Sequence, residues 1–252
     1  MNPKLKVVIA GAGSIGCYVG GMLSKSSANV HFLTRSRIAN DLSKHGIHLT
    51  DWMGGDFQLT PEQLSLSLNE NVLVDAELIL ISVKSKDTQE MAKIIKDSGN
   101  KKATIFSLQN GVSNTQAIQA ILPQHTVLPV MVPYNVIYKA GGHFHCGTSG
   151  DLYCQQHSQA ELLKTLADQS GLGFELKEDM RSILWGKLLL NLNNPVNALS
   201  GIPLKEQFES PQYRKIYLRC LKEGLAVLKA ANIQPGQVAA VPVSVIPIIM
   251  SL

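Results

Sequence analysis

The chain has 252 residues, which is enough for one large domain or two ordinary ones. Hydrophobic residues make up 45% and charged residues 17%, a composition typical of a globular protein with an ample core. The net charge of +4 is mild and the basic residues are scattered, which argues against a nucleic-acid partner and favours a weakly positive cleft for an anionic cofactor and an acidic substrate.

The first predicted element is a strand that runs into a glycine motif, KVVIAGAGSIG, over residues 6–16. The motif has the G-x-G-x-x-G spacing, with Gly11 for a tight turn, Gly13 for approach to a pyrophosphate and Gly16 for packing of the next helix. The start of that helix suits a phosphate anion. We therefore predict a dinucleotide site, against the alternative of a glycine-rich turn in another α/β protein. Its cofactor-binding residues are Gly11, Ala12, Gly13, Ser14, Ile15 and Gly16.

A second predicted strand, Asn29–Leu33, is followed by the sequence Thr34-Arg35-Ser36-Arg37. An NAD site usually has an acidic residue here for the ribose 2′-hydroxyl, whereas a guanidinium can hold a 2′-phosphate. The sequence therefore favours NADP(H), with Arg35 as the first candidate and Arg37 as the second. The alternative is that both arginines are solvated surface charges.

The next segments alternate between strands and helices. The run 78–83 is almost wholly apolar, as expected for a parallel strand covered on both faces, and strands are also predicted at 104–108 and 126–132. Helical spacing marks 87–97 and 114–121.

Two polar residues follow the ends of these strands, where a parallel sheet presents its ligand crevice. Lys84 comes after the apolar run, with Lys86 as a neighbour, and can approach the cofactor; the alternative is a solvated charge. Asn110 can donate and accept hydrogen bonds to a cofactor carboxamide or a substrate oxygen, unless Asn110-Gly111 is simply a turn.

The glycine-rich stretch 141–154 predicts short strands and tight turns at the sheet edge. His143 and His145 alternate on one of these strands. No third metal ligand is evident, so we interpret them as a structural pair and predict no metal site.

After Glu178 the strand signals end, and helices are predicted over 178–199, over 212–231 and into the tail. The fold class is therefore α/β: a Rossmann-type, doubly wound, mostly parallel sheet over 1–177, followed by a smaller all-helical domain over 178–252. We expect substrate to bind in the cleft between the two domains.

Lys187, Asn191 and Asn194 have the spacing i, i+4 and i+7, so they share one face of a helix that is otherwise rich in leucine. An ammonium group and two amides are costly to bury unless something binds them. A 2-oxo acid would do so through its carbonyl and carboxylate oxygens. The alternative is a polar stripe that faces solvent.

The remaining features concern location. The four cysteines have no C-x-x-C spacing, which is typical of a reducing compartment, and the first strand begins too early for a signal peptide, so we expect a cytoplasmic protein. The apolar tail 238–252 is short and is interrupted by Pro242 and Pro247. We expect it to be a buried segment rather than a membrane span.

The chain resembles the ketopantoate reductase (2-dehydropantoate 2-reductase) family over nearly its whole length. The resemblance is carried by GAGSIG, the arginine after the second strand, Lys84, SLQNGV and WGKLLLNLNNPVNAL. The resemblance implies reduction of 2-dehydropantoate to pantoate with NADPH, in pantothenate and coenzyme A synthesis. It implies that Lys187 is the catalytic proton donor, that Asn191 and Asn194 bind substrate, that Asn110 contacts cofactor and substrate, and that Lys84 contacts the cofactor.

The chain departs from the family pattern at its C-terminal side. Family members continue for several tens of residues and carry there a serine and a glutamate that this chain lacks, so we expect its helical domain to be incomplete. Two alternatives to the family activity are a paralogous NADPH-dependent reductase of another 2-oxo acid and a non-catalytic NADP(H)-binding protein. The oligomeric state is open, with a homodimer among the alternatives.

Overall fold

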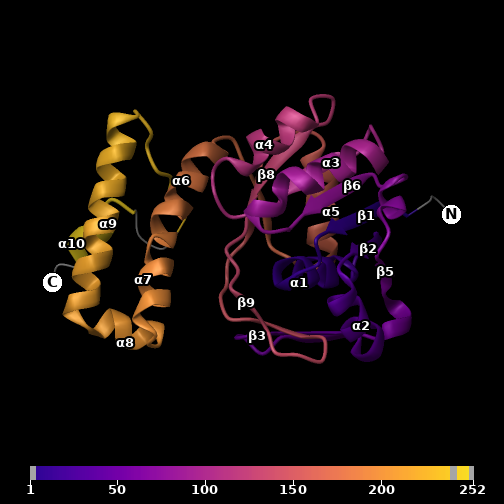
Figure 1. The fold of residues 1–252 in the computed structure, drawn as a ribbon, viewed down its shortest axis with the longest axis horizontal. Helices are drawn as coiled ribbons and strands as arrows, with labels where there is room; N and C mark the ends of the chain where they lie inside the picture. Colours follow the sequence, from indigo (N-terminus) through magenta and orange to yellow (C-terminus); the bar gives the residue numbers. More distant parts are fainter. Residues whose placement is uncertain (1–3, 239–242, 250–252) are drawn as a thin grey trace. The chain divides into compact units, whose positions relative to one another are not determined.

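The computed structural model describes residues 4–238 and 243–249. It divides into two compact units, Met1–Glu178 and Asp179–Leu252 (Figure 1), and each unit is described by itself below.

The first unit is built on an eight-stranded sheet in the order β12-β11-β8-β7-β6-β1-β2-β5. All neighbouring strands are parallel except β8 and β11, which are antiparallel. This confirms the predicted Rossmann-type, mostly parallel sheet. The strands are β1 (Lys6–Ala10), β2 (Asn29–Leu33), β5 (Ser65–Ser67), β6 (Leu78–Ile81), β7 (Thr104–Ser107), β8 (Val127–Met131), β11 (Leu152–Gln155) and β12 (Phe174–Lys177).

Helices cover both faces of this sheet because the side chains of each strand alternate between two apolar layers. In β1, Val7 and Ile9 face one layer with α1 and α5, while Val8 and Ala10 face the other with α3 and α4. The helices are α1 (Ser14–Leu23), α2 (Ser36–His45), α3 (Thr88–Ser98), α4 (Asn114–Ile121) and α5 (Ala160–Ser170). Short 3₁₀ turns lie at η1 (Pro61–Gln63), η2 (Glu70–Leu73) and η3 (Ser85–Asp87).

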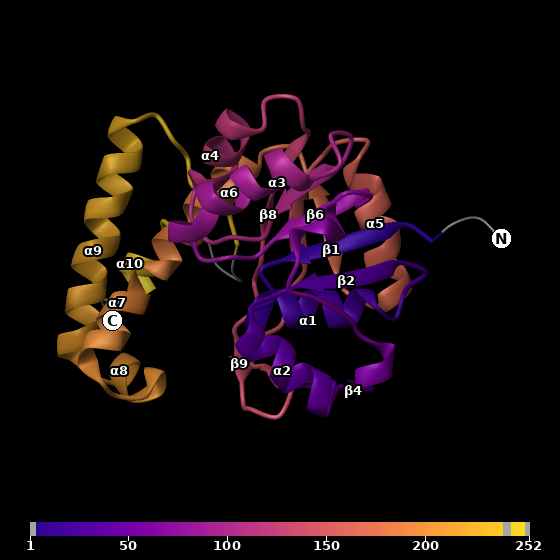
Figure 2. The same cartoon turned by 45° about the vertical axis from the view of Figure 1, so that its right-hand side comes forward.

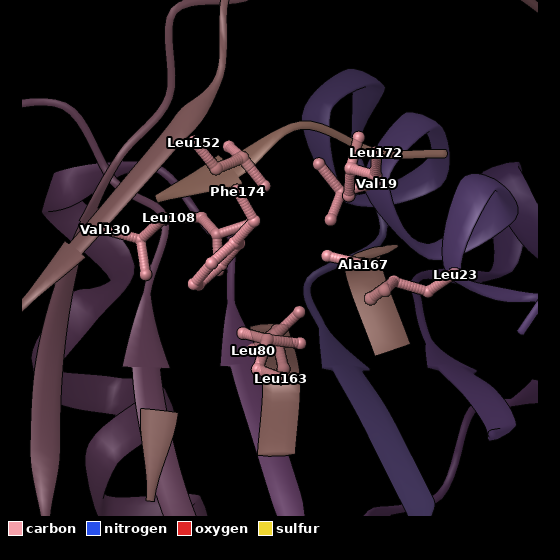
Figure 3. A pocket seen from close by; sticks show the side chains of 10 residues that line it. All are labelled: Val19, Leu23, Leu80, Leu108, Val130, Leu152, Leu163, Ala167, Leu172 and Phe174. Atoms are coloured by element: carbon pink, nitrogen blue, oxygen red, sulfur yellow. The ribbon is translucent and has the colours of Figure 1, made fainter. Parts of the chain in front are cut away.

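The first of these layers is densely packed. Figure 3 shows ten apolar side chains from α1, α5, the sheet and the loops after β7 and α5, among them Leu80, Leu163 and Phe174, pointing toward one another. The space they enclose has no room for a water molecule. It is therefore core rather than a ligand site, and its packing fixes the position of α1 over the sheet.

A second sheet, in the order β4-β3-β10-β9, is not predicted from the sequence. Its strands are β3 (Ile47–Asp51), β4 (Asp56–Leu59), β9 (Val136–Tyr138) and β10 (His143–Cys146). The expected strand at His143 is confirmed, but it pairs with β3 in this small sheet. The expected edge position is wrong for β11, because β12 pairs with it on the outer side.

The described part of the second unit contains only helices, as predicted (Figure 2). They are α6 (Met180–Asn191), α7 (Asn193–Ser200), α8 (Leu204–Glu209), α9 (Pro211–Ala230) and α10 (Ile246–Ile249). A buried cluster that includes Leu189, Tyr217 and Leu221 forms its core.

The single helix predicted over 178–199 is wrong, because it is interrupted at Leu192. Pro195 has no backbone N–H to donate to the carbonyl of Asn191, and its ring crowds that carbonyl. The helix α6 therefore ends at Asn191, and α7 begins two residues later.

The predicted buried tail is only partly borne out. Val243 and Pro247 are buried, whereas the Ile248 side chain is 66% exposed. The expected tail helix is the short α10, and the remainder of this prediction, at 239–242 and 250–252, lies outside the described residues. Within the described residues, no helix is long and apolar enough to cross a membrane.

A hydrogen-bond network joins the loops that follow β6 and β7. The buried amide of Gln109 donates to the carbonyl of Val83 at 2.9 Å and to the Thr88 hydroxyl at 2.7 Å, and accepts from Ser107 at 3.1 Å. Thr88 in turn donates to Asn114 at 3.1 Å. Since these loops carry Lys84 and Asn110, the network fixes the backbone from which both side chains project.

In the second unit, a close backbone contact fixes the segment that follows α9 against α6. Gly236 N donates to Ser182 O at 2.7 Å. A Cβ atom at Gly186 would lie 2.1 Å from the carbonyl oxygen of Gly236. The residue before Lys187 must therefore be glycine for this contact to form.

We expect Gln109→Leu to destabilise the first unit by about 1–3 kcal/mol, because it leaves the Thr88 hydroxyl and the Val83 carbonyl without their buried partner. Urea unfolding measures the change. Gln116→Leu, on the exposed face of α4, is the control and should change the free energy of unfolding by less than about 0.5 kcal/mol. Equal effects of the two substitutions would contradict a structural role for the network.

We expect Gly186→Ala to destabilise the helical unit by about 1–3 kcal/mol, since the added methyl group displaces the Gly236 backbone. Hydrogen exchange of the Gly236 amide should become faster. Gly147→Ala is the matched control, because its Cβ atom would come no closer than 3.8 Å to another heavy atom. Unchanged exchange at Gly236 would show that the contact is not needed.

Candidate functional site

The glycine motif forms the turn between β1 and α1, and each glycine has a different surrounding. Gly11 has φ +93°, and a Cβ atom there would lie 2.3 Å from the Val83 side chain. At Gly16 a Cβ atom would lie 2.4 Å from the Ser82 hydroxyl oxygen. A Cβ atom at Gly13 would meet only the Gly11 carbonyl oxygen, at 4.0 Å. The first and third glycines thus permit close packing, and the second leaves open space beside the helix.

The start of α1 is suited to an anion. Gly13 is its N-cap residue, no side chain caps the helix, and no acidic residue lies in its first turn. The N–H groups and the positive end of the helix dipole are therefore available to a phosphate group.

A pocket of about 410 Å³ opens beside this turn. The residues that line it come from the glycine turn, from α2, from the loops after β6, β7 and β8, and from the small sheet. They are Gly13, Ser14, Ile15, Arg37, Ile38, Ser82, Lys84, Asn110, Tyr134, Asn135, Val136, Tyr138 and Phe144.

Lys84 and Asn110, both predicted from the sequence, line this pocket. Lys84 precedes η3, and Asn110 lies in the turn whose next residue, Gly111, has φ +106°. The Asn110 carbonyl accepts a hydrogen bond of 2.7 Å from Asn114. Asn110-Gly111 is therefore a turn, as the alternative interpretation holds, and it also places Asn110 at the pocket.

The two arginines after β2 are placed differently. Arg37 lines the pocket, whereas Arg35, the first candidate from the sequence, is not among the lining residues. The Arg35 side chain is 81% exposed and its guanidinium donates to Asp87 at 3.2 Å. The helix α2 starts at Ser36, so its first turn carries Arg37 toward the pocket while Arg35 remains at the N-cap position.

Sequence reasoning missed the aromatic wall of the pocket, which includes Tyr134 and Tyr138. The Tyr138 hydroxyl donates to Asp41 on α2, and Gly142 N donates to the same carboxylate at 2.9 Å. Burial and this hydrogen bond raise the pKa of Tyr138 to about 12. Burial raises the pKa of Asp41, but the hydrogen bonds from Tyr138 and Gly142 outweigh burial and hold this pKa below its usual range. The ionised Asp41 carboxylate therefore holds the β9–β10 hairpin beside the pocket.

In the helical unit, Lys187 lies on α6 in a half-buried position. Burial lowers the pKa of its ammonium group. Such a group gives up its proton more readily than an exposed lysine does, which suits a proton donor.

The asparagines of the predicted polar face are separated by the helix break. Asn191 is the last residue of α6 and is half-buried, whereas Asn194 is exposed in the first turn of α7. Between them, buried Asn193 accepts a 2.7 Å hydrogen bond from Gln207 on α8. Asn193 is thus a structural residue of this segment.

The histidines of β10 form a cluster with residues of β3. The rings of His48 and His143 stack at 4.4 Å, and the Thr50 hydroxyl lies 2.8 Å from ring nitrogens of His143 and His145. His48 adds a contact of 3.2 Å with Asp56. In the part of the chain that the structure describes, no group of three or more His, Cys, Asp or Glu side chains is arranged to hold a metal ion.

The chain matches "Ketopantoate reductase PanE/ApbA" over residues 7–159 and "Ketopantoate reductase PanE/ApbA C terminal" over residues 179–249. It is 25% identical over 240 residues to a 2-dehydropantoate 2-reductase of Halobacterium salinarum, covering 92% of this chain and 78% of that protein. For a 2-dehydropantoate 2-reductase of Archaeoglobus fulgidus the identity is 24% over 235 residues, covering 88% and 74%.

Solved structures have the same fold. A PanE/ApbA family ketopantoate reductase from Ralstonia eutropha JMP134 superposes with a TM-score of 0.85 at 28% identity, covering 98% of this chain and 82% of that one. D-mandelate dehydrogenase, solved with NADH and anilino(oxo)acetate, has a TM-score of 0.79 at 19% identity, covering 98% and 79%, which shows similarity of fold alone.

The glycine turn, the polar strand ends and the half-buried lysine thus occur in a chain whose two parts both match one family of oxidoreductases. The protein belongs to the ketopantoate reductase family and is an oxidoreductase.

Proposed function

We propose that this protein is an NADPH-dependent reductase that converts 2-dehydropantoate to pantoate, a step of pantothenate and coenzyme A synthesis. The observation that carries the proposal is the combination, in one member of this family, of the pocket at the glycine turn with the half-buried Lys187.

The residues at the pocket fit a dinucleotide. The open space at Gly13 and the uncapped start of α1 suit a pyrophosphate. Lys84 adds a positive charge, and the Asn110 amide can bind a carboxamide or a substrate oxygen. Gly11, Ala12, Ser14, Ile15 and Gly16 complete the proposed cofactor-binding turn.

The preference for NADPH rests on the segment after β2. It contains Arg35 and Arg37 and no carboxylate before Asp41, whose Oδ2 atom accepts hydrogen bonds from Tyr138 and Gly142. A guanidinium can bind a 2′-phosphate through charge-assisted hydrogen bonds. We propose that Arg37, which lines the pocket, is the main partner of this phosphate, and that Arg35, which is paired with Asp87, contributes less.

When bound, the nicotinamide supplies a hydride to the carbonyl carbon of the 2-oxo acid. The protein must stabilise the negative charge that develops on the carbonyl oxygen and protonate that oxygen. We assign this task to the Nζ atom of Lys187, since burial lowers its pKa toward that of an effective general acid. Asn191 and Asn194 orient the substrate by hydrogen bonds to its carboxylate and hydroxyl oxygens.

The proposal is tested by following the absorbance of NADPH after addition of 2-dehydropantoate. Oxidation of NADPH with a higher kcat/KM for 2-dehydropantoate than for other branched 2-oxo acids supports it. A higher kcat/KM for another acid would instead favour a paralogous reductase. Tight binding of NADPH without turnover of any 2-oxo acid would favour a non-catalytic protein.

We expect Lys187→Ala to lower kcat by about 10²- to 10⁴-fold and to leave the Kd for NADPH within about twofold, because the lysine acts on the substrate oxygen. Lys205→Ala, which removes an exposed lysine of α8, is the control and should change neither constant. In the wild type, kcat should fall as the pH rises through the lowered pKa of Lys187, since the proton donor is then lost.

Lys187→Met separates this catalytic role from a structural one. The charged lysine opposes folding below its lowered pKa, because the unfolded chain holds the proton more firmly. We therefore expect Lys187→Met to retain or raise the melting temperature at pH 7 while it abolishes turnover. Parallel losses of stability and activity would argue against the proton-donor role.

For the cofactor, Arg37→Gln and Arg35→Glu should each raise the Kd for NADPH more than the Kd for NADH, because each removes a charge from the proposed 2′-phosphate site. We expect a change in the Kd ratio of about tenfold for Arg37→Gln and more for the charge reversal at Arg35. Isothermal titration with both dinucleotides measures the ratio. An unchanged ratio in both variants would contradict the assignment of NADPH.

A further inference from the structure

We propose that Asp87 determines cofactor preference through its ion pair with Arg35: it draws the guanidinium away from a bound 2′-phosphate and so keeps the discrimination against NADH weak. This inference rests on the proposed function, since it concerns the adenosine end of the same cofactor site.

The sheet order places the two residues on opposite sides of the glycine turn. In the order β6-β1-β2, Arg35 follows β2, the glycine turn follows β1, and Asp87 lies in η3 after β6. The outer two of three adjacent strands are separated by about 10 Å. Arg35 Nη2 nevertheless reaches Asp87 Oδ2 at 3.2 Å, so its side chain extends across the end of β1.

This is the region that the adenosine ribose of a dinucleotide occupies, beside the end of the second strand. The ion pair therefore lies where the difference between NADH and NADPH is recognised. Arg37 lines the pocket, but Arg35 does not, and its guanidinium is bonded to Asp87 instead.

The two partners of the ion pair are held unequally. The Asp87 side chain is only 21% exposed, whereas that of Arg35 is 81% exposed. Asp87 occupies the N-cap position of α3, where the helix dipole favours a carboxylate, and its backbone N–H donates to Lys84 O at 2.8 Å. The backbone that carries the carboxylate is thus held in place, and the long Arg35 side chain extends to it.

This carboxylate affects the two cofactors differently. A 2′-phosphate must compete with Asp87 for the guanidinium of Arg35. A 2′-hydroxyl has no charge for the guanidinium to neutralise, so binding of NADH does not incur this cost. Asp87 therefore lowers the affinity for NADPH relative to NADH, and its removal should restore Arg35 to the phosphate.

The test is Asp87→Asn in the full chain. Asparagine has nearly the same size and is an equally good N-cap residue, so α3 should remain folded. The Kd values for NADPH and NADH are measured by isothermal titration at low salt. We expect the ratio Kd(NADH)/Kd(NADPH) to rise about tenfold, and less at high salt, where exposed charges are screened. Glu90→Gln, which removes an exposed carboxylate of the same helix, is the control and should change the ratio by less than about twofold.

A second measurement asks whether Asp87 acts through Arg35. In the Arg35→Gln background, Asp87→Asn should change the ratio by less than about twofold, since there is no guanidinium left to release. A full tenfold effect without Arg35 would overturn the proposed route and assign the effect to direct repulsion. A ratio that falls or stays unchanged in Asp87→Asn alone overturns the inference.

The binding measurements distinguish a wrong role for Asp87 from a wrong proposed function. Wild-type protein that binds both dinucleotides and turns over a 2-oxo acid, but whose Kd ratio does not respond to Asp87→Asn, overturns only the role of Asp87. Wild-type protein that binds neither dinucleotide overturns the proposed function and this inference with it.

Discussion

The close approach of the backbone after β1 to the residues after β6 is the constraint on which the pocket depends. Gly11 and Gly16 have no space for a Cβ atom beside Val83 and Ser82, and the Ser82 hydroxyl donates to Gly11 O at 2.8 Å. This contact sets where α1 begins, and the apolar layer shown in Figure 3 holds α1 in that place. The uncapped start of α1 therefore lies at the carboxyl ends of the strands, beside the polar residues of the loops that follow β6 and β7.

Loops supply most of the groups at the pocket, and buried or partly buried hydrogen bonds hold these loops in place. Gln109 joins the segments after β6 and β7, and Asp41 joins α2 to the β9–β10 hairpin. The carboxylates of this region also have partners: Asp87 pairs with Arg35, Asp41 accepts hydrogen bonds from Tyr138 and Gly142, and neither lines the pocket. The pocket therefore presents Arg37, Lys84 and a helix start, a set of groups that favours an anionic ligand, while the nearby carboxylates are already hydrogen-bonded.

Local sequence patterns predict the parts of this site that local geometry determines. The G-x-G-x-x-G spacing and the apolar run at Leu78 were sufficient for the turn, for β6 and for the position of Lys84, because strand and turn signals act over a few residues. Such local signals do not predict the small sheet, since β3 pairs with β10 across almost a hundred residues of chain. The same distance hid Tyr138 and its partner Asp41, which are 97 residues apart.

In the segment of α6 and α7, one residue interrupts a helix that the periodic pattern predicts as continuous. Lys187, Asn191 and Asn194 fit a single helix face, but Pro195 ends that helix at Asn191. The break frees the next turn to rotate, so Asn193 is buried against Gln207 while Asn194 is exposed. Lys187 and Asn191 remain on α6, which the Gly186–Gly236 contact anchors. Catalytic and substrate-binding groups both need a fixed position, so the anchored helix can position Lys187 and Asn191, whereas the position of Asn194 depends on the packing of a separate helix.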